Sequence, residues 1–313
     1  MATILITRGL PPEGFAVLSG HNIIAPPLLE AFSEDELLRH IPDADAVVAA
    51  SALSRRVISA GGKLKIIANY GAGYDSVDIR AAAEMGIPVT NIPEAVTRDT
   101  AELTLGLMLA VSRRIGEMNL RLRQEEPESL FGTGRHMGFS LHGRTLGIIG
   151  CGRIGARVAE LARAFGMHVI GYSRRGVDPS VAESVSMDAL LARADIITLH
   201  CPLTDETRGL IGQDAFARMR PGTMFINTSR GAVADHDALL AALDRGIIAG
   251  AGLDVFPDEP HIPEALLRHP NVVCTPHIGT NTHQSRREMA HACSLQLLDA
   301  LAGRRPENIV NGL

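Results

Sequence analysis

The stretch LGIIGCGRIGARVAE, residues 146 to 160, decides the fold. It begins as an apolar run with the character of a buried strand, and it ends with the spacing of an amphipathic helix. Between the two lie Gly150, Gly152 and Gly155, which fit the pattern GxGxxG. A strand, this pattern and a helix in succession are typical of a dinucleotide-binding turn. We therefore predict a doubly wound, Rossmann-like α/β unit around these residues.

Each glycine has a separate physical reason. Gly150 allows the tight turn, Gly152 lets a pyrophosphate approach the main chain, and Gly155 lets the helix pack close to the strand. Arg153 and Ile154 lie in the first helical turn, where main-chain N–H groups face the phosphates. The alternative is a plain strand–turn–helix unit that binds nothing.

The end of the next strand bears on the choice of cofactor. An acidic residue about 20 positions after the glycines would bind the ribose hydroxyls of NAD. The sequence YSRRG, residues 172 to 176, instead has Ser173, Arg174 and Arg175 there. A hydroxyl and two guanidinium groups suit a 2′-phosphate, which predicts NADP in preference to NAD. The alternatives are that both arginines are solvated loop charges, or that Asp178, which is poorly placed, supplies the acid.

The bulk composition is that of a globular protein of about two domains. The chain has 313 residues, of which 46% are hydrophobic and 21% charged, with a net charge of −5. This balance argues against nucleic acid or a membrane surface as the main partner. We recognise no secretory signal and no membrane span, and the four cysteines are widely separated, so we expect a cytoplasmic protein with reduced thiols.

Strand-like and helix-like segments alternate twice along the chain. The first series ends near residue 90, a long helix is predicted over residues 98 to 124 with Asp99 or Thr100 as its cap, and the second series begins at residue 145. We predict two α/β domains with parallel sheets and an active-site cleft between them. Residues 1–98 plus 285–313 would form a flavodoxin-like substrate-binding domain, and residues 99–284 the dinucleotide-binding domain.

Three polar residues follow apolar strands in the last third of the chain. They are Arg230, Glu259 and His277, and the carboxyl ends of parallel strands are where ligands bind in such sheets. His277 could donate a proton to a carbonyl oxygen, Glu259 could orient its ring, and Arg230 could hold a carboxylate through two hydrogen bonds. Taken singly, each could equally be structural; together, beside a dinucleotide motif, they favour catalysis.

Another glycine turn lies in the first series, at Gly71, Ala72 and Gly73. Its main-chain N–H groups could form a nest for an anion. A simple tight turn capped by Asp75 or Ser76 is an equally good reading. No metal site is expected, because the histidines and cysteines lack a ligand spacing.

Six stretches together resemble the D-isomer-specific 2-hydroxyacid dehydrogenase family over nearly the whole chain. They are NYGAGYDSVD, TAELTLGLML, GRTLGIIGCGRIG, RPGTMFINTSRG, GLDVFPDEP and TPHIGTNT. The resemblance implies that Arg230 binds the substrate, that Glu259 orients the histidine, that His277 is the acid/base, and that the turn at residues 71–73 binds the substrate carboxylate. It also implies that Thr100, Asp254 and Gly279 lie around the nicotinamide and that Cys201 and Pro202 wall the adenosine pocket. Thr207, Thr228 and Ser229 complete the predicted cofactor-binding set.

The resemblance further implies a homodimer and the reduction of a small 2-oxo acid to the D-2-hydroxy acid. The YSRR sequence looks like that of the NADPH-preferring glyoxylate/hydroxypyruvate and 2-ketogluconate reductases. The family often has a tryptophan before the glycine motif, whereas this chain has FGTGRHMGFSLHG there and no tryptophan. Two rival functions remain: a dinucleotide-sensing scaffold without catalysis, and a phosphite- or formate-type dehydrogenase.

Overall fold

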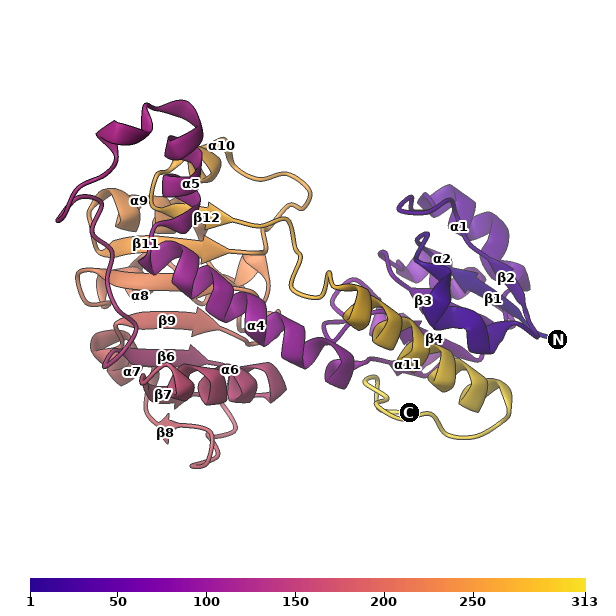
Figure 1. Ribbon diagram of the computed structural model, residues 1–313. Coiled ribbons are helices and arrows are strands. Elements are labelled where there is room, and N and C mark those ends of the chain that lie inside the picture. The colour runs from indigo at the N-terminus through magenta and orange to yellow at the C-terminus, as the bar shows by residue number, and fades with distance from the viewer. The chain divides into compact units, whose positions relative to one another are not determined.

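Two parallel β-sheets organise residues 1–313, all of which the computed structural model describes (Figure 1). The first compact unit comprises Met1–Val96 and Thr280–Leu313, and the second comprises Thr97–Gly279. The prediction of two α/β domains with parallel sheets is confirmed. The predicted domain boundaries lie after residues 98 and 284. In the structure, one compact unit gives way to the other after residues 96 and 279. The cleft between the domains stays a prediction.

The first unit is built on five strands in the order β2-β1-β3-β4-β5. These are β1 (Thr3–Ile6), β2 (Asn22–Ile24), β3 (Ala46–Ala49), β4 (Ile66–Asn69) and β5 (Val89–Thr90). Strands β3 and β4 are buried at every position, as parallel strands covered on both faces must be. The helical elements are η1 (Pro12–Leu18), α1 (Glu34–His40), η2 (Ile41–Asp43), α2 (Arg55–Ala60), α3 (Ile79–Glu84) and α11 (His283–Leu301).

The second unit has seven strands in the order β12-β11-β10-β9-β6-β7-β8. These are β6 (Thr145–Ile149), β7 (His168–Tyr172), β8 (Glu183–Ser184), β9 (Ile196–Leu199), β10 (Thr223–Asn227), β11 (Ile248–Leu253) and β12 (Val272–Cys274). All of its neighbouring strands are parallel. The chain moves outward from β6 in both directions, so β6 and β9 flank the switch point where such sheets bind ligands.

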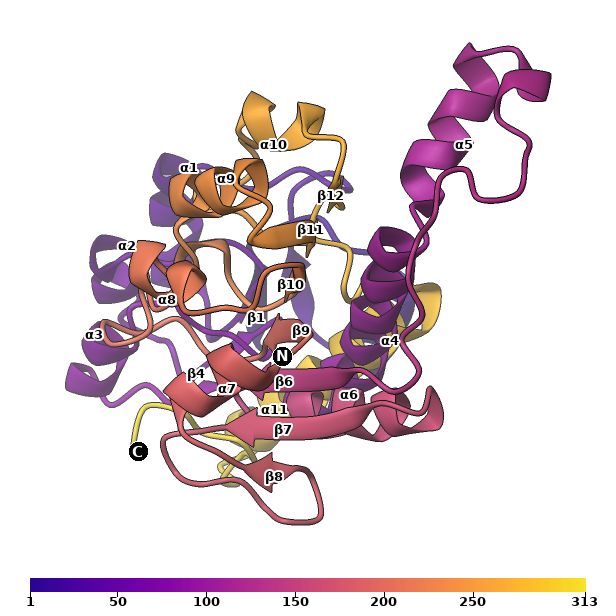
Figure 2. The ribbon, with the colours of Figure 1, turned by 90° about the vertical axis from the view of Figure 1, so that its left-hand side faces the viewer.

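Helices cover both faces of this second sheet. The helical elements of this part of the chain are α4 (Pro93–Ser112), α5 (Ile115–Gln124), α6 (Arg153–Ala164), α7 (Met187–Arg193), α8 (Gln213–Ala217), α9 (His236–Asp244) and α10 (Glu264–Arg268), with short η3 (Pro127–Ser129) and η4 (Gly231–Val233). Of these, α5 projects away from the sheet and buries none of its residues (Figure 2). Met108 of α4 and Val158 of α6 pack in one apolar core. Leu190 of α7 and Phe216 of α8 pack in the other. The alternating strand residues divide between the two cores, which gives three layers.

The prediction of one helix over residues 98–124 is wrong. Helix α4 begins at Pro93 and ends at Ser112, Arg114 has a left-handed φ of +54°, and α5 then runs in a new direction (Figure 2). Phe139 N–H donates to the Ser112 carbonyl at 3.0 Å, which closes the end of α4. Asp99 and Thr100 therefore lie inside α4, and neither caps it. None of the helices is both long enough and apolar enough to cross a bilayer.

Candidate functional site

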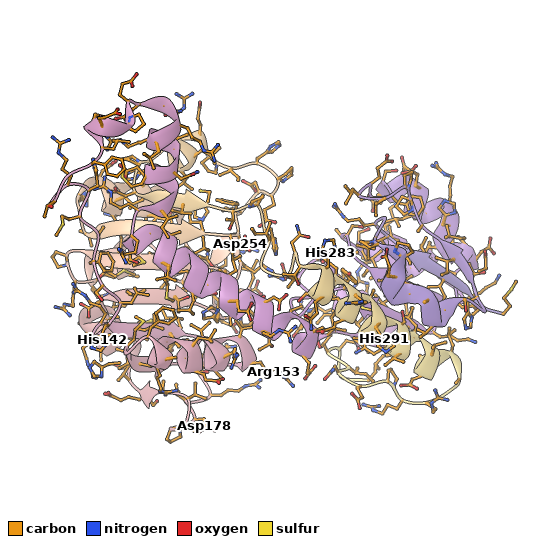
Figure 3. All side chains as sticks on the ribbon, in the orientation of Figure 1. His142, Arg153, Asp178, Asp254, His283 and His291 are labelled. Carbon is orange, nitrogen blue, oxygen red and sulfur yellow. The ribbon has the colours of Figure 1, made fainter.

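The turn between β6 and α6 has the geometry that its glycines predict. Gly150 has a φ of +99°, a conformation that favours glycine, and a side chain on Gly155 would overlap the Gly150 carbonyl. Gly152 is the N-cap of α6, and no side chain caps this helix with a hydrogen bond. No atom lies within 4 Å of the position that a Cβ on Gly152 would take. The open helix start beside Gly152 fits a dinucleotide pyrophosphate. Arg153 and Ile154 lie in the first turn of α6, and Figure 3 labels Arg153.

Ser173, Arg174 and Arg175 form the turn that follows β7. Gly176 N–H donates to the Ser173 carbonyl at 3.0 Å, and Gly176 has a φ of +84°. The guanidinium of Arg174 lies 3.4 Å from the Glu206 carboxylate. The Asp178 carboxylate accepts the N–H and the hydroxyl of Ser180 at 2.8 and 2.7 Å, so it is held within its own loop. Neither side chain of the arginine pair is buried.

The loop after β9 brings three further predicted residues beside the glycine turn. The main chain around Cys201 lies against Gly150, so that a side chain on Gly150 would overlap it. The Thr207 hydroxyl donates to the Pro202 carbonyl at 2.6 Å and accepts the Thr204 N–H at 2.8 Å. Burial raises the pKa of the Cys201 thiol to about 11, so the thiol is protonated and uncharged at neutral pH.

Glu259 and His277 form a direct pair beyond the ends of β11 and β12. His277 Nδ1 lies 2.7 Å from Glu259 Oε2, and the Phe256 N–H donates to Glu259 Oε1 at 3.0 Å. Burial of the Glu259 carboxyl raises its pKa, but the hydrogen bonds from His277 and Phe256 and the charges of His277 and Arg230 outweigh burial, so its pKa lies below the usual value. Glu259 is thus the charged partner that holds the ring.

Arg230 follows β10 and belongs to the same cluster of loops. Its guanidinium lowers the pKa of Glu259, and its Nη1 donates to the Ser229 carbonyl at 2.8 Å. The next residue, Gly231, packs against the main chain of Phe256 so closely that any side chain there would overlap it. The loops that carry Arg230 and Glu259 are therefore fixed against each other.

Asp254 holds the segment on either side of His277. Its carboxylate accepts the Thr275 hydroxyl at 2.6 Å and the N–H groups of Ile278 and Gly279 at 2.8 and 2.9 Å. Its carbonyl accepts the His277 N–H at 2.9 Å. Burial raises the pKa of Asp254, while these hydrogen bonds oppose the rise. Asp254 (labelled in Figure 3) therefore positions the turn that carries the imidazole.

Thr100 lies beside that turn, since a Cβ on Gly279 would lie 3.5 Å from its hydroxyl oxygen. Thr228 is held nearby, its hydroxyl 2.9 Å from that of Thr104. The second unit thus contains every predicted site residue except those of the 71–73 turn. No group of three or more histidine, cysteine, aspartate or glutamate residues has the arrangement of a metal site.

The turn at residues 71–73 lies in the first unit, directly after β4. Asn69 Nδ2 donates to the carbonyls of Gly71 and Gly73 at 3.0 and 2.9 Å, and Asn91 Nδ2 donates to the Ala72 carbonyl at 2.8 Å. The N–H groups of Ala72 and Gly73 donate to no other group of the protein. With its carbonyls held by amides, this turn offers main-chain donors to an anion.

Two asparagines in this description were missed from the sequence. Asn69 holds the turn just described, and Asn227 accepts the N–H and the hydroxyl of Ser229 at 3.0 and 2.9 Å and donates to the Arg230 carbonyl at 2.9 Å. Each is the last residue of its strand. A buried strand that ends in asparagine is the signal that could have found them, because a buried amide must have partners.

Comparison with known proteins adds a family to this geometry. A model of the D-isomer specific 2-hydroxyacid dehydrogenase NAD-binding domain matches residues 105–279, more than half of the chain. A glyoxylate reductase of Thermococcus litoralis is 41% identical over 325 aligned positions, which cover 98% of this chain and 96% of that protein. A D-3-phosphoglycerate dehydrogenase of Methanocaldococcus jannaschii is 39% identical over 99% of this chain but only 60% of its own length.

The structure itself resembles a solved NADPH-dependent glyoxylate/hydroxypyruvate reductase from Sinorhizobium meliloti, in complex with NADP and malonate. The TM-score is 0.88 at 30% identity, and the match covers 99% of this chain and 96% of the other.

Proposed function

Because the chain belongs to the D-isomer-specific 2-hydroxyacid dehydrogenase family, we propose that it is an NADP-preferring reductase of small 2-oxo acids. Its substrate would belong to the glyoxylate, hydroxypyruvate or 2-ketogluconate class, and its product would be the D-2-hydroxy acid. The observation that carries the proposal is the His277–Glu259 pair, 2.7 Å apart and at the same sheet edge as the glycine turn.

The two ring nitrogens of His277 have separate tasks in this proposal. Nδ1 is bound to Glu259, which fixes the ring and leaves Nε2 to donate a proton to the carbonyl oxygen of the substrate. Arg230 binds the substrate carboxylate and polarises the neighbouring carbonyl, since a guanidinium offers paired donors. The nicotinamide, when bound, supplies the hydride to C2. The His277 side chain is 48% exposed, which leaves it accessible to a substrate.

The turn at residues 71–73 would bind the substrate carboxylate through its main-chain N–H groups. The unused donors of Ala72 and Gly73 support this role. For the cofactor, the preference for NADP is supported by the turn after β7, where Ser173 and Arg174 stand and Asp178 is engaged with Ser180. NAD would be the second, less preferred cofactor.

A substrate panel tests the proposed activity. Glyoxylate, hydroxypyruvate, 2-ketogluconate, pyruvate and phenylpyruvate are each offered with NADPH and with NADH, and loss of absorbance at 340 nm is followed. D-3-phosphoglycerate with either oxidised cofactor is added because one relative is a D-3-phosphoglycerate dehydrogenase. We expect the highest kcat/KM with NADPH and one of the first three acids. His277→Ala should lose turnover by orders of magnitude while still binding NADPH.

Two other functions predict different results. A dinucleotide-sensing scaffold would bind NADPH and turn over none of the acids. A phosphite- or formate-type dehydrogenase would instead reduce NADP⁺ or NAD⁺ with those donors. Turnover of an oxo acid by the wild type that vanishes in His277→Ala excludes both.

We also propose that the protein is a homodimer formed through the second unit. Helix α5 buries none of its residues, and Ile115, Leu120, Phe131 and Met137 on it and the following loop are 54%, 52%, 75% and 73% exposed. A groove of about 660 Å³ adjoins them, lined in part by Leu120, Met137, Leu267 and Arg268. One surface thus carries both a projecting apolar segment and a groove, as a two-fold interface between identical chains requires.

A further inference from the structure

The guanidinium of Arg174, a proposed ligand of the 2′-phosphate, already has an anionic partner. Arg174 Nη1 lies 3.4 Å from Glu206 Oε2, and the two side chains come from different loops, after β7 and after β9. The charge of Arg174 also lowers the pKa of Cys201, though burial outweighs it. Arg174 therefore lies over the loop that begins at Cys201.

Glu206 is held in place by its own loop. The Thr204 hydroxyl donates to Glu206 Oε2 at 2.7 Å, and Thr204 is itself fixed through its N–H to the Thr207 hydroxyl at 2.8 Å. The hydrogen bonds from Thr204 and from the main chain, with the charge of Arg174, lower the pKa of Glu206, so the group is an anion at neutral pH. The carboxylate does not depend on Arg174 for its position.

We propose that Glu206 is a specificity-determining residue that competes with the 2′-phosphate of NADP for Arg174 and so limits the preference for NADP over NAD. Glu206 engages Nη1 of Arg174, which is one of the donors that a phosphate bound through two parallel hydrogen bonds would use, so the two anions compete for it. NAD carries no 2′-phosphate and leaves the ion pair intact. This inference rests on the proposed use of a 2′-phosphorylated cofactor.

The size of the effect follows from exposure. The side chains of Arg174 and Glu206 are 60% and 66% exposed, so the ion pair between them is weak. Breaking it to bind a phosphate therefore costs a factor of about two to five in affinity. The cost should fall as salt screens the pair.

The test uses two probes that differ only in the 2′-phosphate. Binding of 2′,5′-ADP and of 5′-AMP to the full-length protein is measured by calorimetry for the wild type and Glu206→Gln. We expect Glu206→Gln to tighten 2′,5′-ADP by about two- to fivefold and to leave 5′-AMP unchanged. Asp188→Asn is the matched control, since it removes one carboxylate from another exposed pair, with Arg218, and should move neither probe.

A double-mutant cycle with Arg174→Ala shows whether Glu206 acts through Arg174. In the Arg174→Ala protein, Glu206→Gln should no longer tighten 2′,5′-ADP. If the same gain persists there, the carboxylate repels the phosphate directly and the competition is refuted. An unchanged or weakened affinity of Glu206→Gln for 2′,5′-ADP overturns the inference as well.

Failure of the proposed function gives a different result. If the wild type binds 2′,5′-ADP and 5′-AMP equally tightly, the proposed preference for NADP is wrong. The competition between Glu206 and the 2′-phosphate is judged separately, by the change in affinity that Glu206→Gln causes. If Glu206→Gln tightens 2′,5′-ADP and not 5′-AMP, the competition is supported even when the wild type shows no preference.

Discussion

His277 and Glu259 form a hydrogen-bonded pair, with Nδ1 of the imidazole 2.7 Å from Oε2 of the carboxylate. The hydrogen bond and charge of His277 help to lower the pKa of Glu259. The carboxylate is therefore ionised at neutral pH, and it holds the ring through Nδ1. When the pH falls below the lowered pKa of Glu259, the carboxylate is protonated and the ring loses its anionic partner.

Glu259→Gln should therefore lower the rate of reduction. Glutamine keeps a similar shape but not the charge, so it holds the His277 ring less firmly. We expect kcat/KM to fall by about tenfold or more, while NADPH affinity, measured as the control, stays unchanged. An unchanged kcat/KM would show that Glu259 does not position the histidine.

The residues that carry the proposed chemistry were predictable because their side chains have few other uses at strand ends. An apolar run precedes each of Arg230, Glu259 and His277, and that pattern can be read directly from the sequence. Asn69, Asn227 and Thr275 were not found, because their roles depend on main-chain atoms that only the folded loops bring near. Glu206 belongs with them, since its partner Arg174 is more than 30 positions away in the sequence.

At the scale of elements, the β6–α6 turn separates what a glycine does for folding from what it does for binding. A side chain on Gly155 would overlap the Gly150 carbonyl, whereas a Cβ on Gly152 meets nothing within 4 Å and its φ of −76° suits any residue. The two positions can thus be tested as a matched pair of alanine substitutions.

Gly155→Ala should lower the free energy of unfolding by about 1 to 3 kcal/mol, because α6 must move away from β6. Gly152→Ala should unfold like the wild type but bind NADP⁺ at least tenfold more weakly, because the added methyl group occupies the approach of the pyrophosphate. Thermal unfolding and calorimetric binding measure the two effects. Wild-type NADP⁺ affinity in a stable Gly152→Ala protein would exclude this turn as the phosphate site.

His200, the residue after β9, should make the stability of the folded protein depend on pH. Burial lowers the pKa of His200 to about 3, its Nε2 lies 3.0 Å from the Thr198 hydroxyl, and its Nδ1 has no partner. The folded protein keeps this ring neutral, while the unfolded chain binds a proton below about pH 6.5. Stability from this group is therefore complete above pH 6.5 and falls as the pH drops toward 3.

His200→Gln should flatten this dependence. We expect the wild type to lose up to about 1.4 kcal/mol per pH unit from this residue below pH 6.5, and the variant to lose less. Urea midpoints at pH 7, 6, 5 and 4 compare the two proteins. His236, whose pKa burial also lowers, is present in both, so parallel curves would mean that His200 is not the cause.

The prediction of secondary structure failed where the sequence has no glycine or proline to mark the end of a helix or strand. The break between α4 and α5 falls at Arg113 and Arg114, which are good helix formers, and it depends on Phe139 reaching the end of α4. Strands β2, β5 and β8 also lack a clear signal in the sequence. They are two or three residues long, and β2 and β8 have mostly exposed residues, so no apolar run marks them.

At the scale of the molecule, the alternation of strands and helices predicted the fold class, because a parallel sheet needs a helix between successive strands. What the sequence could not give is the path of residues 115–139, which lack a buried apolar face of their own. The proposed homodimer accounts for that segment.

Sedimentation should find the wild type as a dimer at micromolar concentration. Leu120→Glu and Leu267→Glu should each shift it toward the monomer, because each places a charge in an apolar contact. Leu295→Glu, at an exposed position of α11 in the other unit, is the control and should stay dimeric. A wild type that sediments as a monomer would refute the proposed interface.

The left-handed backbone of His277, with a φ of +52°, has a consequence for protein design. A residue other than glycine pays about 1 kcal/mol for that conformation, and here Asp254 restrains the turn that holds it. Anyone who grafts the imidazole and its carboxylate onto another scaffold must transplant this aspartate and its turn as well. If only the imidazole and its carboxylate are copied, the backbone of the new scaffold will not hold the imidazole in the orientation that it has here.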